Sequence, residues 1–214
     1  MGNVFFLSLR RIRPMLKVKR PFHVVMLGLD NSGKTTILYR SKFREFVKTV
    51  STTAFNVEIV RPFKGVRFKV WDIGGRDQNR PLWKAYVRHT DAIIFVVDST
   101  NESRLEEAKE ELFNILNCAQ LNGAPILVYA NKQDLPSAVS PREIANRLSL
   151  HDLNSRHQWF VQPSSALLGE GLQDGLLRLS EMIIQWKLDL KRSKANRKRK
   201  SLASSRTNSI NNII

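Results

Sequence analysis

Short apolar segments alternate along this chain with longer segments whose apolar residues recur every three or four positions. The short, β-branched segments predict buried strands, and the longer ones predict amphipathic helices. The predicted strands are residues 23–29, 55–62, 66–71, 92–98, 125–131 and 159–163, and the predicted helices are residues 34–46, 104–118, 141–148 and 172–190. Because strands alternate with helices, we expect an α/β fold with a mostly parallel six-stranded sheet flanked by helices.

Turn and capping signals refine this pattern. The segments 55–62 and 66–71 are joined by a short link through Gly65, which predicts an antiparallel hairpin at the edge of the sheet. Ser103 and Ser140 each stand three residues before a glutamate, as in a capping box. They therefore predict two helix N-termini.

A glycine-rich motif follows the first predicted strand. It reads Gly28-x-x-x-x-Gly33-Lys34-Thr35 and opens the helix 34–46, which is the arrangement of a phosphate-binding P-loop. Its glycines let successive N–H groups point at a phosphate near the positive end of a helix dipole. The lysine can reach the β- and γ-phosphates, and the threonine hydroxyl can ligate Mg²⁺. The alternative is an ordinary glycine turn. The predicted phosphate-binding residues are Gly28, Leu29, Asp30, Asn31, Ser32, Gly33, Lys34, Thr35 and Thr36.

The motif Asn131-Lys132-Gln133-Asp134 indicates which base is bound. It follows an apolar strand pattern, so it lies at a strand's carboxyl end, where open α/β sheets bind ligands. The Asp134 carboxylate can accept hydrogen bonds from N1–H and the exocyclic amine of guanine, whereas adenine offers no such pair of donors. A polar turn is the alternative for this motif taken alone. With the P-loop upstream, Asn131, Lys132 and Asp134 predict that the nucleotide is GTP or GDP.

A third motif ends the segment 66–71. Asp72 follows this alternating strand as a carboxylate placed to hold Mg²⁺ through water. Gly75 lacks a side chain, so its N–H can approach a γ-phosphate closely. Upstream, the polar loop 51–56 can donate a threonine hydroxyl to the metal. These residues predict a sensor for the γ-phosphate.

Five motifs together resemble the ADP-ribosylation factor (Arf) family of small GTPases. They are Gly28-Leu-Asp-Asn-Ser-Gly-Lys-Thr35, Trp71-Asp-Ile-Gly-Gly75, Arg80-Pro-Leu-Trp83, Phe95-Val-Val-Asp-Ser99 and Asn131-Lys-Gln-Asp-Leu-Pro136. The resemblance runs from about residue 23 to residue 186. With Gly2-Asn3 and a basic tail, the chain looks most like the Arf-like branch that carries such a tail. The resemblance implies the P-loop NTPase (small GTPase) fold and a GTP/GDP switch in signal transduction or vesicle transport, with Mg²⁺.

The resemblance also assigns individual roles. Thr52 matches the family's Mg²⁺-sensing threonine, and Ser165 and Ala166 match the loop whose backbone N–H contacts the guanine carbonyl. Gly2 matches a myristoylation site, although Phe6 stands where the acceptor motif prefers Ser or Thr. The family's exposed aromatic triad, which recognises effectors, corresponds to Phe55, Trp71 and Tyr86. The alternative for these aromatic residues is an ordinary core.

The chain departs from the family pattern at Arg76, where the family has the glutamine that orients the attacking water. A guanidinium has no acceptor for this task, and Gln78 comes two residues too late. We therefore expect slow GTP hydrolysis; the alternative is that Arg76 supplies positive charge to the transition state. Around Thr52, Ser51 and Ala54 replace the usual proline and glycine, which alters the conformational freedom of that loop.

The net charge of +16 belongs to the two ends of the chain. Residues 1–20 carry six Lys/Arg and no acid, and residues 187–214 carry nine against one aspartate, which leaves +2 for residues 21–186. We expect a basic N-terminal arm (1–20), a GTP-binding domain (21–190) and a basic, disordered tail (191–214). This distribution favours an anionic membrane surface over nucleic acid as the partner. Cys118 is the only cysteine, which excludes an intrachain disulfide and is typical of a reducing compartment.

Both arms carry signals for membrane binding. Phe5, Leu9, Ile12 and Leu16 are spaced as one face of a helix, which Pro14 would kink. A myristoyl chain binds only marginally, so basic residues near an anionic leaflet would have to add to it. The basic run 191–200 could instead act as a nuclear import signal or be merely solvated.

The leading hypothesis is a monomeric, membrane-associated GTP/GDP switch of Arf-like type on the cytoplasmic face of a membrane. Its exchange factor, GTPase activator and effectors are unidentified. The main alternative is a non-hydrolysing GTP-binding interaction module, which Arg76 favours. A P-loop nucleotide or small-molecule kinase is disfavoured, because residues 131–134 recognise guanine in a switch arrangement.

Overall fold

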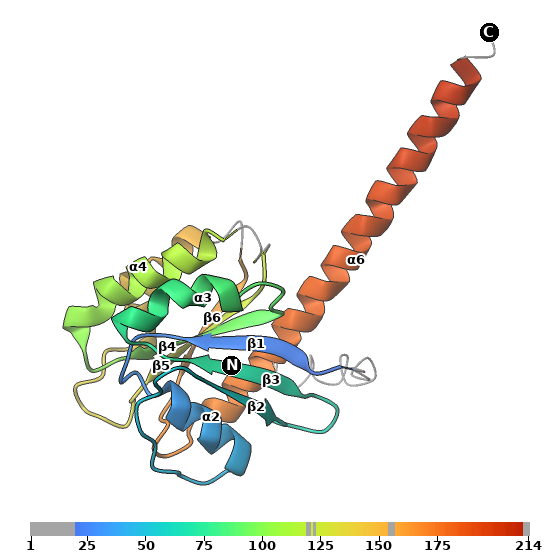
Figure 1. The fold of residues 1–214 in the computed structure, drawn as a ribbon. Helices are drawn as coiled ribbons and strands as arrows, with labels where there is room; N and C mark the ends of the chain where they lie inside the picture. The colour runs from blue at the N-terminus through green and yellow to red at the C-terminus, as the bar shows by residue number, and fades with distance from the viewer. Residues whose placement is uncertain (1–19, 119–120, 122, 154–156, 212–214) are drawn as a thin grey trace.

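The structure is a computed structural model that describes residues 20–118, 121, 123–153 and 157–211, with side chains to residue 197. Gly2 and the predicted amphipathic positions from Phe5 to Leu16 lie outside these ranges. A single sheet forms the centre of the molecule (Figure 1). Its strands are β1 (Phe22–Leu27), β2 (Phe55–Val60), β3 (Phe68–Ile73), β4 (Ala92–Asp98), β5 (Ile126–Asn131) and β6 (Trp159–Pro163).

The strand order is β2-β3-β1-β4-β5-β6. The pairs β3–β1, β1–β4, β4–β5 and β5–β6 are parallel, and β2 pairs antiparallel with β3 at the edge. This confirms the predicted six-stranded, mostly parallel sheet and its edge hairpin. The strand β3 begins and ends two residues later than predicted, so Asp72 lies inside it, opposite Asn56.

The helices are α2 (Lys34–Phe43), α3 (Arg80–Tyr86), α4 (Leu105–Leu116), α5 (Pro141–Arg147) and α6 (Leu172–Asn211), with 3-10 turns η2 (Asp77–Asn79), η3 (Glu102–Arg104) and η5 (Leu150–Leu153). The predicted cap at Ser140 is confirmed, because its Oγ accepts from the Glu143 N–H at 3.2 Å. The predicted cap at Ser103 is wrong. Its hydroxyl donates to Asn101 Oδ1, and the turn η3 precedes α4 instead.

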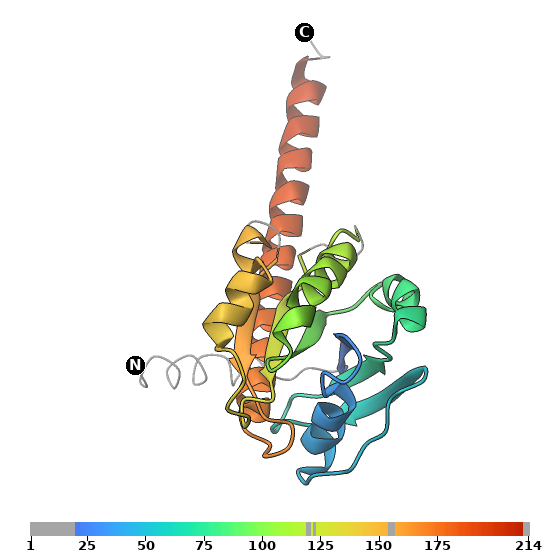
Figure 2. The ribbon, with the colours of Figure 1, turned by 90° about the vertical axis from the view of Figure 1, so that its left-hand side faces the viewer.

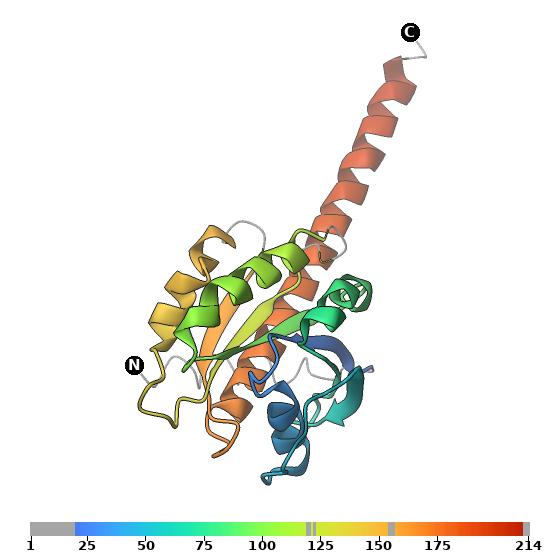
Figure 3. The same cartoon turned by 60° about the vertical axis from the view of Figure 1, so that its left-hand side comes forward.

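Helices cover both faces of the sheet, as Figures 2 and 3 show from two sides. The helices α3, α4 and α5 pack on one face, and α2 and α6 pack on the other. The strand β1 supplies both cores in alternation, because Val25 and Leu27 face the first set of helices while Val24 and Met26 face the second. Strands buried on both faces are typical of parallel sheets between helices.

The last helix, α6, begins against the sheet and then runs far out of the domain as a rod (Figure 1). Near its start, Gly175 leaves room for the ring of Tyr129, whose hydroxyl donates to the Leu172 carbonyl at 2.7 Å. The structure differs here from the predicted disordered tail, because α6 continues through residues 191–211. That segment contains no proline or glycine to end a helix. None of the described helices is long and apolar enough to cross a membrane.

Candidate nucleotide-binding site

The P-loop, residues 28–33, connects the carboxyl end of β1 to the N-terminus of α2. Gly28 and Gly33 have φ values of 138° and 93°, which side chains rarely adopt. A Cβ at Gly28 would also collide with the Val96 carbonyl, and one at Gly33 with the Asn131 amide. Both glycines are therefore required by backbone conformation and by space. The predicted phosphate-binding loop has the expected strand–loop–helix context.

Lys34 lies beneath this loop and is 6% exposed. Its Nζ donates to the Leu29 carbonyl at 2.9 Å. Burial lowers the pKa of Lys34 to about 8, although the charges of Asp72 and Asp30 oppose the shift. A phosphate that entered the loop would offer this ammonium a stronger partner than a neutral carbonyl.

Four residues from three separate segments meet beside Lys34. The Thr35 hydroxyl donates to Asp72 Oδ2 at 2.7 Å and lies 2.7 Å from the Thr52 hydroxyl. Asn56 Nδ2 donates to Asp72 Oδ2 at 3.1 Å and to Thr52 Oγ1 at 3.2 Å. Asp72 is fully buried, and burial raises the pKa of its carboxyl, against the hydrogen bond from Thr35. The sequence motifs predicted Thr35 and Asp72 here, and the family resemblance predicted Thr52, but nothing indicated Asn56.

Two segments lie against the P-loop and the start of α2. We call residues 48–54 the first switch segment and residues 74–79 the second switch segment. The first, with the start of α2, lines a cleft of about 340 Å³. The second places Gly75 against the P-loop, where an added Cβ would lie 2.5 Å from the Asp30 nitrogen. The N–H of Gly74 donates to the Ala54 carbonyl at 2.8 Å and joins the two segments. Gly75 is therefore placed as a γ-phosphate sensor requires.

Arg76 follows Gly75 directly, and its side chain is exposed. Within the described ranges the Arg76 side chain makes no hydrogen bond or ion pair. The adjacent guanidinium, Arg80, is in contrast almost completely engaged: its Nε donates to the Gly75 carbonyl at 3.0 Å, and its side chain is 9% exposed. The Arg76 guanidinium is therefore a cation with no partner among the described residues, next to Gly75, the predicted phosphate sensor.

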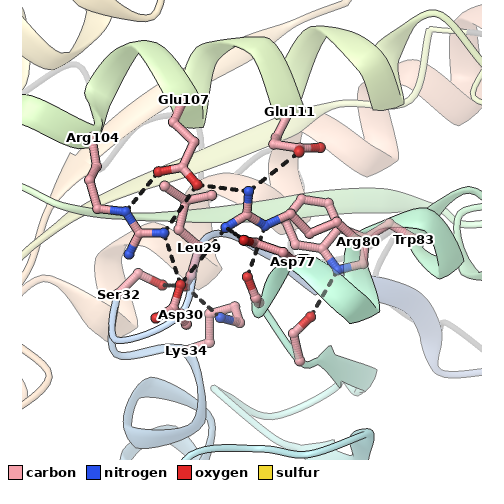
Figure 4. A network of polar contacts seen from close by, with 12 residues as sticks. Leu29, Asp30, Ser32, Lys34, Asp77, Arg80, Trp83, Arg104, Glu107 and Glu111 are labelled. Carbon is pink, nitrogen blue, oxygen red and sulfur yellow. Dashed lines mark hydrogen bonds and ion pairs between the residues drawn. The ribbon is translucent and has the colours of Figure 1, made fainter.

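Arg80 and Arg104 join the second switch segment to the P-loop and to α4 (Figure 4). Arg104 bridges Asp30 at 2.9 Å and Glu107 at 2.7 Å, and its hydrogen bond holds the pKa of the Glu107 carboxyl below its usual range. Trp83, fully buried, donates from Nε1 to the Gly74 carbonyl at 3.0 Å. The ion pairs of Arg80 are to Asp77 at 2.6 Å, Glu107 at 2.7 Å, Glu111 at 3.5 Å and Asp30 at 3.9 Å. Sequence reasoning missed this network, because its members carry no local signature.

The predicted base-reading motif lies at the carboxyl end of β5. Asn131 joins the P-loop to the loop after β6. Its Nδ2 donates to the Ser32 carbonyl at 2.8 Å, and its Oδ1 accepts from the Ala166 N–H at 3.0 Å. Lys132 has a φ of 67° and pairs with Asp98 at 2.6 Å. The Asp134 carboxylate is half-buried and has no hydrogen-bond partner among the described residues. It is therefore available to a ligand with two adjacent donors.

The loop after β6 lies beside Asn131, as the resemblance implied. The Ser165 hydroxyl accepts from the Leu168 N–H at 3.0 Å, and Ser165 and Ala166 are both buried. In this structure the Ala166 N–H donates to Asn131, so its contact with a guanine carbonyl stays a prediction.

The three aromatic residues assigned to effector recognition do form one cluster. The ring centroids of Phe55 and Trp71 are 5.5 Å apart, and Tyr86 lies 5.8 Å and 5.9 Å from them. Phe55 is 46% exposed, whereas Trp71 and Tyr86 are half-buried and pack against the core beneath α3 and α4. The cluster is therefore partly surface and partly core.

Together, a P-loop, a threonine–aspartate cluster beside it and a free carboxylate on the neighbouring strand end define a guanine-nucleotide-binding protein with the small GTPase fold. A family model described as the ADP-ribosylation factor family matches residues 9–183. The chain belongs to this family, which makes it an Arf-like, GTP-binding switch protein.

Individual relatives agree with this assignment. The chain is 50% identical to human ADP-ribosylation factor-like protein 4C over 176 residues, which is 80% of this chain and 92% of that protein. It is 47% identical to human ADP-ribosylation factor-like protein 4A over 180 residues, 82% of this chain and 90% of that protein. Among solved structures, the Arl6 BBS3 small GTPase from Trypanosoma brucei, with bound nucleotide analogue GppNp, matches with a TM-score of 0.71 and 36% identity over 78% of this chain and 99% of that one.

Proposed function

We propose that this protein is a membrane-recruited GTP/GDP switch that hydrolyses GTP slowly and so remains in the GTP-bound form. The observation that carries the proposal is Arg76, whose exposed guanidinium follows the phosphate sensor Gly75 where a water-positioning acceptor is needed. An in-line water must be oriented by an acceptor, and a guanidinium offers only donors. The other parts of a nucleotide site are present, so binding is retained while hydrolysis is impaired.

The residues beside Lys34 fit a magnesium ion. Asp72 Oδ1 is buried and has no hydrogen-bond partner among the described residues, and oxygen donors are what Mg²⁺ prefers. Thr35 and Thr52 would supply hydroxyl oxygens, and Asp72 would hold the ion through water. When bound, the ion would neutralise charge on the β- and γ-phosphates. Thr52 belongs to the first switch segment, so its place in this cluster depends on that segment being closed.

The hydrolysis proposal is tested with Arg76→Gln. This change restores an acceptor at the position after Gly75, and we expect the single-turnover rate of GTP hydrolysis to rise about ten- to a hundredfold. The measurement is phosphate release from GTP-loaded protein. Lys84→Gln is the matched control, because it makes the same substitution at an exposed position on α3 and should leave the rate unchanged.

Two results would argue otherwise. A lower rate in Arg76→Gln would show that the wild-type arginine stabilises transition-state charge. An undetectable rate in both proteins would favour the second candidate function, a non-hydrolysing GTP-binding interaction module, which the missing acceptor at position 76 also supports.

For the output of the switch, we propose that the cluster of Phe55, Trp71 and Tyr86 recognises an effector. Phe55 begins β2 directly after the first switch segment, and Tyr86 ends α3 after the second. A movement of either segment would therefore alter the cluster. Trp71, on β3 between them, provides a fixed base.

For recruitment, we propose that both basic arms meet an anionic membrane on its cytoplasmic face, with Gly2 as a myristoylation site. On α6, every side chain from residue 191 to 197 is exposed, which makes the basic residues there accessible to lipid headgroups. A nuclear role for this run is the alternative. Basic residues near an anionic surface add about 1 kcal/mol each.

Deleting residues 191–214 tests the role of the tail. This deletion removes eight Lys/Arg, and we expect binding to phosphatidylserine-rich vesicles to fall more than a hundredfold, from about 1 kcal/mol per charge. The wild-type interaction should weaken as salt rises, because exposed charges are screened within about 8–10 Å. Deleting only residues 201–214 removes one arginine and is the control. Equal binding by the longer deletion would rule out the tail as a membrane contact.

A further inference from the structure

Asn79 ends the second switch segment and is a buried polar residue, 8% exposed. Its Nδ2 donates to the Thr53 carbonyl at 3.0 Å. This is a side-chain bond from one switch segment to the backbone of the other, across 26 positions of the sequence. The backbone N–H of Asn79 donates to the Arg76 carbonyl at 2.8 Å, and this hydrogen bond closes the turn η2.

The side-chain amide of Asn79 occupies the space where a side chain on residue 74 would lie. A Cβ at Gly74 would collide with Asn79 Nδ2 and would lie 2.9 Å from the Thr52 carbonyl. The absence of a side chain at position 74 thus lets Asn79 reach the first switch segment. The Gly74 peptide is itself held on both sides, by Ala54 through its N–H and by Trp83 through its carbonyl.

The anchored carbonyl belongs to the residue directly after Thr52. The side chains of Ser51, Thr53 and Ala54 are exposed, so packing contributes little to holding this stretch in place. Polar contacts hold it instead, and they include the bonds from Asn79 to Thr53 and from Gly74 to Ala54. Without the bond to Thr53, the position of the Thr52 hydroxyl beside Thr35 would be less well determined.

We propose that Asn79 is a positioning residue that couples the two switch segments, so that closure of the second segment holds Thr52 in the triphosphate site. The inference rests on the role proposed above for Thr52. Among the described residues, no hydrogen bond joins the Asn79 side chain to the phosphate loop or to the side chains of the predicted metal residues, so it acts through the Thr53 backbone. Its effect should therefore appear in binding of a triphosphate and be absent in binding of a diphosphate, which has no γ-phosphate for the switch segments to close on.

The test compares the affinities of the full chain for GDP and for the non-hydrolysable analogue GppNHp, both with Mg²⁺. Asn79→Leu keeps the branched shape and the number of heavy atoms of the side chain but cannot donate a hydrogen bond. We expect GppNHp to bind about three- to tenfold more weakly, the range for loss of one buried hydrogen bond, while GDP affinity stays within about twofold. Asn114→Leu is the matched control, because it makes the same substitution at an exposed position on α4 and should change neither affinity. Asn79→Ala repeats the measurement if the leucine variant does not fold.

A double-mutant cycle with Thr52→Ala distinguishes coupling from general stability. If Asn79 acts by positioning Thr52, then Asn79→Leu causes no further loss of GppNHp affinity in the Thr52→Ala background. Additive losses, or equal losses of GDP and GppNHp, would overturn the inference. If Thr52→Ala weakens GppNHp binding but Asn79→Leu does not, only the coupling is wrong. If Thr52→Ala has no effect, the role of Thr52 fails first and the coupling fails with it.

Discussion

Asp134→Asn is expected to weaken GTP binding about 10²–10⁴-fold and to make xanthosine triphosphate the preferred nucleotide. The carboxylate accepts from two guanine donors, and its loss leaves a donor facing a donor. Xanthine has a carbonyl in place of the guanine amine, so the asparagine NH₂ can donate to it while the amide oxygen accepts from N1–H. The measurement is the dissociation constant of each nucleotide for both proteins. Because the Asp134 side chain has no hydrogen-bond partner among the described residues, the substitution breaks no hydrogen bond within that part of the chain.

The control for this experiment is Asp152→Asn, the same change at an exposed site on η5. It should leave both affinities unchanged. If Asp134→Asn bound GTP as tightly as the wild type does, the carboxylate would not read the base. Recognition would then depend on backbone groups of the loop after β6. Weaker binding of both nucleotides would instead indicate that the loop had moved.

The parts of this site that could be predicted from sequence are those whose chemistry is encoded in a short contiguous run. The P-loop needs glycines at fixed spacing before a lysine, and the base-reading motif needs an aspartate after a strand, so each is visible within about ten residues. The cluster of Thr35, Thr52 and Asp72, proposed above to hold magnesium, was also accessible, because Asp72 lies on a recognisable strand. Its partner Asn56 was not, since a single asparagine entering a strand has many roles.

The contacts that hold the switch segments could not be predicted. Arg104 and Asp30 are 74 positions apart, and Arg80 and Glu111 are 31 apart. Such pairs are created by the packing of α3 and α4 on the sheet and leave no local pattern. The helix α3 was itself missed, because Arg80–Tyr86 spans seven residues and is too short to show helical periodicity.

At the end of the chain, the composition and the structure lead to different descriptions. The polar, basic sequence after residue 190 predicted disorder, because it lacks the apolar residues needed for a core. The structure continues α6 there, with the side chains of residues 191–197 exposed, which requires only that the residues be compatible with a helix. A polar helix with no packed face gains little stability from the domain. The conformation that matters for function is therefore the one that residues 191–214 adopt when bound to a surface.

The second large effect is expected from Lys34→Ala. The lysine is buried beneath the P-loop and is the cation that can reach the β- and γ-phosphates. Its removal deletes charge-assisted hydrogen bonds worth about 1.5–3 kcal/mol each, so both GDP and GTP should bind about 10²–10⁴-fold more weakly. Equilibrium binding of both nucleotides is the measurement. Lys64→Ala, at an exposed position between β2 and β3, is the control and should bind normally.

The same lysine predicts a pH dependence. In the nucleotide-free protein its pKa is about 8, because burial disfavours the charged form, and bound phosphates would raise it. Binding must then take up a proton as the pH approaches and exceeds 8. Affinity for GTP should therefore fall about twofold between pH 7 and pH 8, and more steeply above pH 8, by at most tenfold per unit. The Lys34→Ala variant, which has no ammonium to recharge, should lose this decline. If the decline persists in the variant, another group carries it, and Lys34 is already charged before the nucleotide binds.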